Sequence, residues 1–362
     1  YAGAEAAHRK YDAAMLAAEA EVRQGHLTRA QAWLRRADQW APTPAAREKA
    51  EQSYRAIARQ NPLKVQLSFG FRPSSNVNNG AETAEIEVGG LPFTLDDSGL
   101  ELGGYEATAG ASLSFRLSED ETHRTEILGE IFGRKVWLND DAKAKAPGVD
   151  GSDFDYAAVV GGVRHTALVW PEVGPSQITG VAGQSWYGGE ELARWVELQL
   201  GQIVTRNEDS AWRLRGTLRN EKRLDSDVNS SVVLGLGGEL IWKRESGASV
   251  ALGATYKNYW SDSATVDSQS FGVNASYAFG QIGAIAPKVT ASAETRDYRS
   301  WVATAGGRTD DSLSVGVSLV WPEVSYYGFN PQASLNARRV WSTVDIYDRT
   351  QVSIGLTAVS RF

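Results

Sequence analysis

From residue 63 to the end of the chain, apolar and polar residues alternate with a period of two. The clearest example is residues 352–358, which lead to a terminal aromatic, Phe362. This alternation predicts a β-strand with one apolar face, and a terminal aromatic on such a strand is common in outer-membrane β-barrels. Fourteen segments share the pattern, at about residues 64–74, 104–117, 123–138, 154–169, 176–188, 190–206, 211–223, 229–244, 248–261, 267–281, 288–301, 311–321, 328–341 and 349–362.

The segment lengths and connections favour an antiparallel barrel that crosses a membrane. Most segments are longer than the ~9–11 residues that a tilted strand needs to cross a bilayer. Long loops such as 75–103 and 139–153 follow odd-numbered segments, and short turns such as 118–122 and 245–247 follow most even-numbered ones. Barrels of this class keep short turns in the periplasm and long loops outside. We therefore expect the N-terminal part of the chain in the periplasm.

The aromatic residues test this register independently, because they fall in two groups at opposite ends of the strands. Two aromatic belts mark the two interfaces of a membrane, whereas a soluble β-sandwich or solenoid, the alternative, would bury its tryptophans in mid-strand. The first group is Trp137, Trp186, Tyr187, Tyr259, Trp260, Trp301 and Trp341, and the second is Trp170, Trp212, Trp242, Trp321, Phe329 and Phe362.

The N-terminal part has a different composition. Residues 2–60 are rich in Ala, Glu, Arg and Gln, which predicts helices, with a break at the Pro-Thr-Pro of residues 42–44. Residues 1–62 contain ten Lys and Arg and seven Asp and Glu. The remainder contains 27 Lys and Arg and 37 Asp and Glu. This contrast predicts two domains, a helical one over residues 1–62 and a β-barrel over residues 63–362. The expected fold class is an α+β membrane protein.

Small and apolar residues in the helical part follow the spacing of a tetratricopeptide repeat. Small residues at these positions let two antiparallel helices pack closely, and a glycine permits the turn between them. One repeat cannot bury its own apolar face, so we expect it to stack on the helix that follows. The alternative is a plain helical hairpin. If the repeat forms a groove for a partner protein, its candidate residues are Ala18, Gly25, Trp33, Leu34 and Trp40.

Strand parity assigns charged residues to the interior of the barrel. In the segment 211–223, the residues Trp212, Leu214 and Leu218 would face lipid, which turns a ladder of arginines inward. Charges inside a barrel pair across the lumen or line a pore, and the alternative is a polar interior that only stiffens the wall. The candidate lumen-lining residues are Arg213, Arg215, Arg219, Arg223, Glu294 and Arg296.

The chain offers little for catalysis. It has no cysteine and four histidines, and it carries neither a Gly-rich phosphate loop nor a metal-ligand motif. Paired carboxylates such as Asp96-Asp97 and Asp140-Asp141 fall in the long loops, where a solvated loop is favoured over a weak calcium site. We therefore assign no catalytic, cofactor or metal residue, expect no enzyme activity, and expect no nucleic-acid partner.

Three stretches resemble the surface lipoprotein assembly modulator (Slam) family. The exit of the first strand, Ser74-Ser75-Asn76-Val77-Asn78, looks like the family's Ser-Asn-x-Asn opening. The stretch 327–331, Tyr-Gly-Phe-Asn-Pro, resembles the Gly-Phe-x-Pro before the family's last hairpin, and residues 342–362 resemble its final strand. Together with a tetratricopeptide-like domain before fourteen strands, the resemblance spans the whole chain.

The resemblance implies an outer-membrane translocator of a Gram-negative bacterium that delivers lipoproteins or related proteins to the cell surface. Its partners would be outer-membrane lipids, a client lipoprotein or secreted protein, and as a further candidate a periplasmic chaperone. Two alternatives remain: a passive channel with anion preference, whose filter would be the arginine ladder, and a structural or scaffolding barrel. Strand pairing near 65–71 would close the wall against the last strand, and this seam is a candidate lateral exit for clients.

Overall fold

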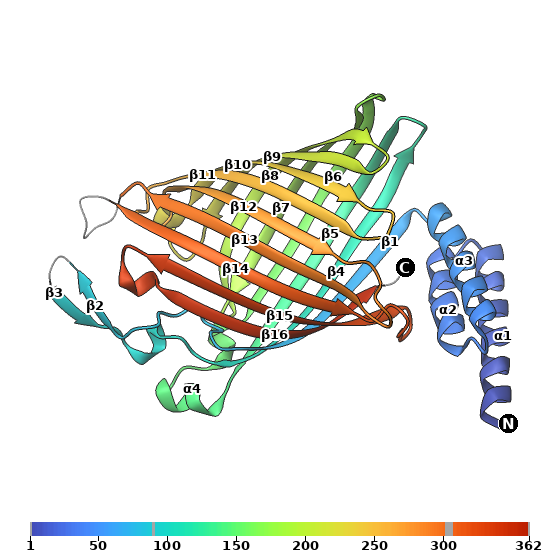
Figure 1. The fold of residues 1–362 in the computed structure, drawn as a ribbon, viewed down its shortest axis with the longest axis horizontal. Coiled ribbons are helices and arrows are strands. Elements are labelled where there is room, and N and C mark those ends of the chain that lie inside the picture. The colour runs from blue at the N-terminus through green and yellow to red at the C-terminus, as the bar shows by residue number, and fades with distance from the viewer. Residues whose placement is uncertain (1, 89–90, 301–306, 361–362) are drawn as a thin grey trace.

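The computed structural model describes residues 2–88, 91–300 and 307–360. Three helices, α1 (Ala2–Arg23), α2 (Leu27–Trp40) and α3 (Pro44–Gln60), come first and lie beside one end of a barrel (Figure 1). None of the helices in the described ranges is long and apolar enough to cross a membrane. Trp301 and Phe362, which the sequence placed in the aromatic belts, lie outside these ranges.

The three helices pack through small residues. Ala14, Ala37 and Ala50 are 0–1% exposed and bring the helix backbones close together. Gly25, with φ +79°, ends α1 in a left-handed conformation that favours glycine, and α2 starts two residues later. The hydroxyl of Thr43 accepts a hydrogen bond from the amide of Ala46, which caps α3 after the predicted break.

Fourteen antiparallel strands form one closed barrel, as the period-two pattern predicts. Each strand pairs with its neighbours along the chain, and β1 closes the wall by pairing with β16. The strands are β1 (Leu63–Ser74), β4 (Gly104–Glu119), β5 (His123–Leu138), β6 (Tyr156–Trp170), β7 (Gly174–Tyr187), β8 (Glu190–Asn207), β9 (Ser210–Arg223), β10 (Ser231–Lys243), β11 (Ser249–Ser261), β12 (Ser268–Ala278), β13 (Ala286–Tyr298), β14 (Arg308–Val320), β15 (Phe329–Ser342) and β16 (Arg349–Ser360).

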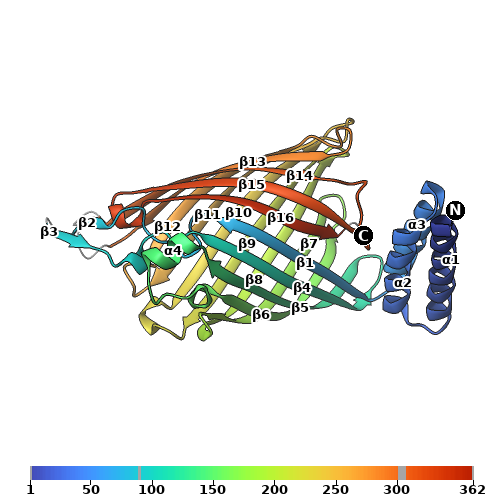
Figure 2. The same cartoon turned by 90° about the horizontal axis from the view of Figure 1, so that it is seen from below.

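The two rims of the barrel differ. The helices adjoin the rim with short turns such as 120–122, 171–173 and 208–209, which we call the short-turn rim. The opposite, long-loop rim carries a hairpin, β2 (Glu85–Val88) and β3 (Leu91–Thr94), and a short helix, α4 (Asp140–Lys145), as Figure 2 shows. The long loops therefore contain regular structure that the sequence pattern did not predict.

The two long loops at that rim share a hydrophobic core. Val77 and Leu102, from the loop between β1 and β4, are 2% and 0% exposed. They cluster with Val136 on β5 and with Ala142 on α4. The apolar contacts fold both loops against the outer ends of β1, β4 and β5.

Alternation along the strands separates two faces of the wall. Outward residues such as Phe69, Leu113 and Ile131 are 45–56% exposed, as expected for side chains that lipid covers. Exposed tryptophans lie at both rims, with Trp137, Trp260 and Trp341 near the long loops and Trp170 and Trp212 near the short turns. Tyr187 and Tyr259 are exceptions to the predicted belts, because the strand register turns both inward.

Candidate functional site

Most of the inward-facing arginines on β9 form ion pairs with carboxylates. Arg213 lies 2.7 Å from Glu239 on the neighbouring strand β10. Arg219 lies 3.6 Å from Glu197 on β8, also pairs with Glu221, and stacks on the ring of Trp195 at 4.3 Å. The ladder is therefore largely neutralised by its neighbours, which favours a role in stiffening the wall.

The remaining lumen candidates lie in three settings. Arg223 pairs with Asp225 at 2.5 Å where β9 ends at the long-loop rim. Arg215 faces the lumen between glycines of β8 and β10, and no ion pair of this residue occurs in the described ranges. Arg296 donates to the hydroxyl of Ser268 at 3.0 Å and stacks on Tyr259 at 4.3 Å.

Glu294 lies two residues before Arg296 on β13, and its neighbours in the register are Gly272 on β12 and Ser312 on β14. Its side chain is half-buried on the inward face. The described ranges contain no ion pair to this carboxylate. The structure therefore does not bring Glu294 and the β9 arginines together.

Two carboxylates on β4 and β5, which the sequence did not single out as one group, are buried between arginines on β1, β5 and β6. Glu106 is 1% exposed and lies 2.7 Å from Arg72 and 3.9 Å from Arg134. Glu126 lies 2.6 Å from Arg124 and 3.7 Å from Arg164. A buried carboxylate is tolerated when cations and hydrogen bonds surround it, so these clusters fix this half of the wall.

The helices dock on the barrel through Arg35 of α2. Its guanidinium donates to the backbone oxygens of Tyr327 and Gly328 at 3.3 Å, between β14 and β15, and to the hydroxyl of Ser360 at 3.1 Å at the end of β16. It also lies over the ring of Phe329 at 5.3 Å. One side chain thus joins the helices to the last hairpin of the barrel.

Two neighbouring contacts extend this docking surface. The side-chain oxygen of Gln39 accepts a hydrogen bond of 2.8 Å from the amide of Tyr327. Trp40 packs edge-on against the ring of Tyr327, with 6.5 Å between centroids. Trp40, which the sequence assigned to a partner groove, therefore contacts the barrel.

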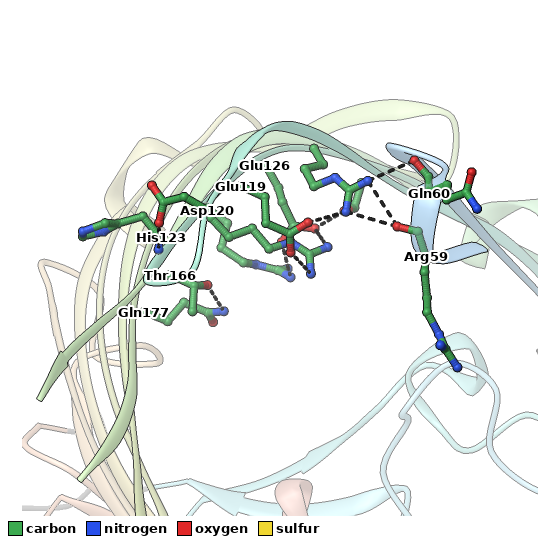
Figure 3. Close-up of polar contacts among 12 residues, drawn as sticks. Arg59, Gln60, Glu119, Asp120, His123, Glu126, Thr166 and Gln177 are labelled. Atoms are coloured by element: carbon green, nitrogen blue, oxygen red, sulfur yellow. Dashed lines mark hydrogen bonds and ion pairs between the residues drawn. The ribbon is translucent and has the colours of Figure 1, made fainter. Parts of the chain in front are cut away.

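The other end of the helical part is held by β4. Arg116 donates to the backbone oxygens of Arg59 and Gln60, at 3.3 Å and 3.0 Å, where α3 ends. Figure 3 draws these bonds to the oxygens of Arg59 and Gln60 and labels Glu119, the last residue of β4, with which Arg116 also pairs. Carbonyl groups at a helix C-terminus lack partners within the helix and carry partial negative charge, so an arginine stabilises them.

Asn61 fixes the connection between α3 and β1. It is 4% exposed, and its amide nitrogen donates to Thr28 at 3.0 Å and Gln31 at 2.6 Å, both on α2. Its side-chain oxygen accepts from the amide of Leu63, the first residue of β1. The helices are therefore held on both sides of the seam between β1 and β16.

The β1–β16 ladder at the seam pairs Phe69 with Ala358, Gly70 with Thr357, Phe71 with Leu356 and Ser74 with Ser353. Residues 361–362 lie outside the described ranges, so toward the short turns the ladder is described only as far as Phe69. On its other side, β1 pairs with β4 over residues 63–74. The sequence placed the seam near residues 65–71; the described pairs confirm this at residues 69–71, and the rest of the prediction involves Phe362, which lies outside the described ranges.

At the long-loop rim, the segment 75–84 closes the seam. Backbone hydrogen bonds join the amide of Ser75 to Val352 at 3.2 Å and the amide of Glu82 to Asp348 at 3.3 Å. The carboxylate of Glu82 pairs with Arg339 of β15. A hydrogen bond from Thr350 and the charge of Arg339 hold the pKa of Glu82 below its ordinary value. Sequence reasoning missed these contacts, because they join residues far apart in the chain.

The other groove candidates lie within the helical part. Ala18 and Leu34 are each 2% exposed and pack on Tyr54. Their side chains hold the helices together and are not on an open surface, because the third helix covers them. Trp33 is half-buried and lies under the guanidinium of Arg36 at 4.4 Å, and Gly25 forms the turn described above.

No group of three or more metal-ligating side chains occurs in the ranges that the structure describes. His123 and His165 stack with ring centroids 5.5 Å apart on the outward face of β5 and β6. Nearby, the carboxylate of Asp120 accepts hydrogen bonds from the backbone amides of Thr122 and His123, and these bonds lower the pKa of Asp120. These contacts shape a short turn.

The closed antiparallel wall, with its apolar outer face, polar lumen and unequal rims, defines an outer-membrane β-barrel. The family model described as surface lipoprotein assembly modifier matches residues 172–362, from the β6–β7 turn to the end. The chain belongs to this family, as predicted. The stretches 327–331 and 342–362 fall within the matched residues, whereas residues 74–78 lie outside them.

Solved outer-membrane proteins show low similarity. The outer membrane channel DcaP of Acinetobacter baumannii is 11% identical over 82% of this chain and 96% of its own, with a TM-score of 0.44. OccAB3 of Acinetobacter baumannii and a BenF-like porin from Pseudomonas fluorescens Pf-5 are each 8% identical over 82% of this chain and 98% of their own, with TM-scores of 0.42. No curated protein matches the chain.

Proposed function

We propose that this barrel passes lipoproteins, or related client proteins, from the periplasm to the cell surface. Family membership supports the client class. The observation that carries the proposal is the position of the helices, which contact both β4 and the β15–β16 hairpin and so span the seam between β1 and β16 at the short-turn rim. A receiving unit at that position would deliver a client directly to the seam.

The helices, residues 1–62, form the receiving domain in this proposal, and residues 63–362 form the barrel. The short-turn rim is periplasmic in barrels of this class, which places the helices in the periplasm. Their packing suits a tetratricopeptide-like unit, and Trp33 is a groove candidate that is only half-buried and makes no hydrogen bond or ring contact with the barrel among the described residues. A periplasmic chaperone would bring the unfolded client to this unit.

The seam would give the client a route, because the first and last strands of the barrel meet there beside the helices. A client segment would enter at this point, and its folding at the surface would supply the driving force. No covalent step is needed, so no residue receives a catalytic role and no cofactor takes part.

Deletion of the gene tests the proposal. Surface display of a lipoprotein encoded next to it should fall to background, and the full chain supplied in trans should restore display. The total amount of that lipoprotein in the cell serves as the control, because loss of expression would imitate loss of export. Unchanged display after deletion would rule out the translocator.

The passive channel remains the second candidate, although its predicted filter is weakened by the pairs that Arg213 and Arg219 form. Planar-bilayer recordings separate the two. A steady, large, anion-selective current would support the channel. A scaffolding barrel would give neither that current nor any effect on display.

A further inference from the structure

One side of the lumen wall contains a recess. A cavity of about 430 Å³ lies against β12–β16 and reaches Arg72 on β1 and Glu239 on β10. Two adjacent rows of the sheet form its floor, and nearly all of their residues are small. In register, one row runs through Asn274, Ser292, Ser314, Arg338 and Gln351, and the next runs through Ser276, Thr290, Gly316, Asn336 and Ser353.

Small side chains explain why the wall is hollow here. Ser292, Ser314 and Gly316 leave space that the long arginines fill on β9. A Cβ at Gly316 would lie 2.8 Å from the hydroxyl of Thr290 and 2.6 Å from the amide oxygen of Asn336. A side chain at this position would therefore displace its neighbours and take up space in the recess. The recess is therefore built into the sequence of these strands.

The cations of the recess differ from those of the opposite wall. Lys288 and Arg338 both line the cavity with exposed side chains, and the described ranges contain no carboxylate within ion-pair distance of either. Arg72 at the margin already pairs with Glu106. Glu239, the one carboxylate in the lining, is already paired with Arg213. Two positive charges thus face the lumen uncompensated.

We propose that this recess binds the carboxylate side chains of an acidic, extended polypeptide segment as a client crosses the barrel. The inference rests on the proposed function and names the client chemistry that suits the lumen. Lys288 and Arg338 would form charge-assisted hydrogen bonds to the carboxylates. The amides of Asn274 and Asn336, and the hydroxyls between them, offer donors and acceptors to the peptide backbone.

The site should select acidic over basic segments. The chain has a formal net charge of −7, so an acidic segment is repelled by most of the protein. Cations without a carboxylate partner, as in the recess, attract it. Binding should therefore weaken with salt, and basic segments should not compete.

The test measures fluorescence anisotropy of a labelled octaglutamate peptide with the purified full chain in detergent at low salt. Octaglutamate should bind, octalysine should not, and Lys288→Gln/Arg338→Gln should weaken binding about tenfold or more, because the variant loses the charge-assisted hydrogen bonds of both cations. The matched control is Arg206→Gln/Lys222→Gln, which removes two exposed cations outside the recess and should leave binding unchanged. Retained heat-modifiable migration on gels confirms that each variant is folded.

Equal loss in both double variants, no loss in either, or no binding of octaglutamate would overturn the proposal. Free glutamate that competes as well as the peptide at equal carboxylate concentration would also overturn it, because the site would then hold a small anion. This outcome is separable from the proposed function. If the peptide binds but gene deletion leaves display unchanged, the translocator function is rejected and the acidic-segment site stands. If deletion abolishes display but the peptide does not bind, the site is rejected and the translocator function stands.

Discussion

The two ends of the β1–β16 seam are held in different ways. At the long-loop end, Ser74 pairs with Ser353, and the segment 75–84 joins the end of β1 to β15 and β16. At the short-turn end, the helices contact both sides of the seam, the last hairpin through Arg35 and β4 through Arg116. The difference indicates that a loop adjoining β1 holds one end of the seam, while a separate group of helices spans the other.

Removal of residues 1–60 is the strongest way to test this contrast. The barrel should stay folded, because its strands pair without the helices, while client display should fall by at least about tenfold as tethered capture is lost. Heat-modifiable migration reports folding and surface labelling reports display. A truncated chain that fails to fold would contradict the division into two domains.

Arg35→Ala sharpens the comparison by releasing the helices on one side only. Loss of its charged hydrogen bonds and its ring contact should weaken docking by about 2 kcal/mol, or roughly thirtyfold. Trypsin cleavage after Arg59 should become faster in proportion. Arg36→Ala is the matched control, because Arg36 stacks on Trp33 within the helices. Similar acceleration in both variants would show that Arg35 does not hold the interface.

The smallest effect is expected at the long-loop end. The pKa of Glu82 is lowered in the folded chain, so its contribution to stability is present above the ordinary carboxyl pKa and is lost as pH falls through the lowered value. The protection factors of the amides in residues 75–84, which are exchange rates corrected for the intrinsic rate at each pH, should therefore fall in acid by an amount that corresponds to at most about 1 kcal/mol. Glu82→Gln should remove this pH dependence. An identical pH profile in the variant would assign it to another group.

The strands were predictable because alternation repeats in every one of them. The fourteen predicted segments overlap the fourteen barrel strands, and the N-terminal segment is helical as its composition indicates. The hairpin β2–β3 and helix α4 were not predicted, since short elements in loops have too few residues to show a period. Their order comes from contacts such as Val77 with Leu102, which the sequence alone does not reveal.

The candidate site was predicted only in part. Strand parity assigned Arg213 and Arg219 to one face of the wall, but whether an arginine is free or paired depends on the strand beside it, and therefore on register. Lys288 and Arg338 were missed because each is a single cation among small residues, and only the closed barrel places both in one recess. Arg35 carried no sequence signal for docking, because its partners lie almost three hundred residues away.

Disulfide locks at the two ends of the seam test the central claim most directly, since the chain has no cysteine of its own. Opposed residues in antiparallel strands lie about 4.5–5.5 Å apart, within the range that a disulfide spans. Phe69→Cys/Ala358→Cys would lock the short-turn end, and Ser74→Cys/Ser353→Cys the long-loop end. The account predicts that the first lock abolishes lipoprotein display until a reductant restores it, while the second leaves display intact. Full display with the short-turn end locked would contradict it.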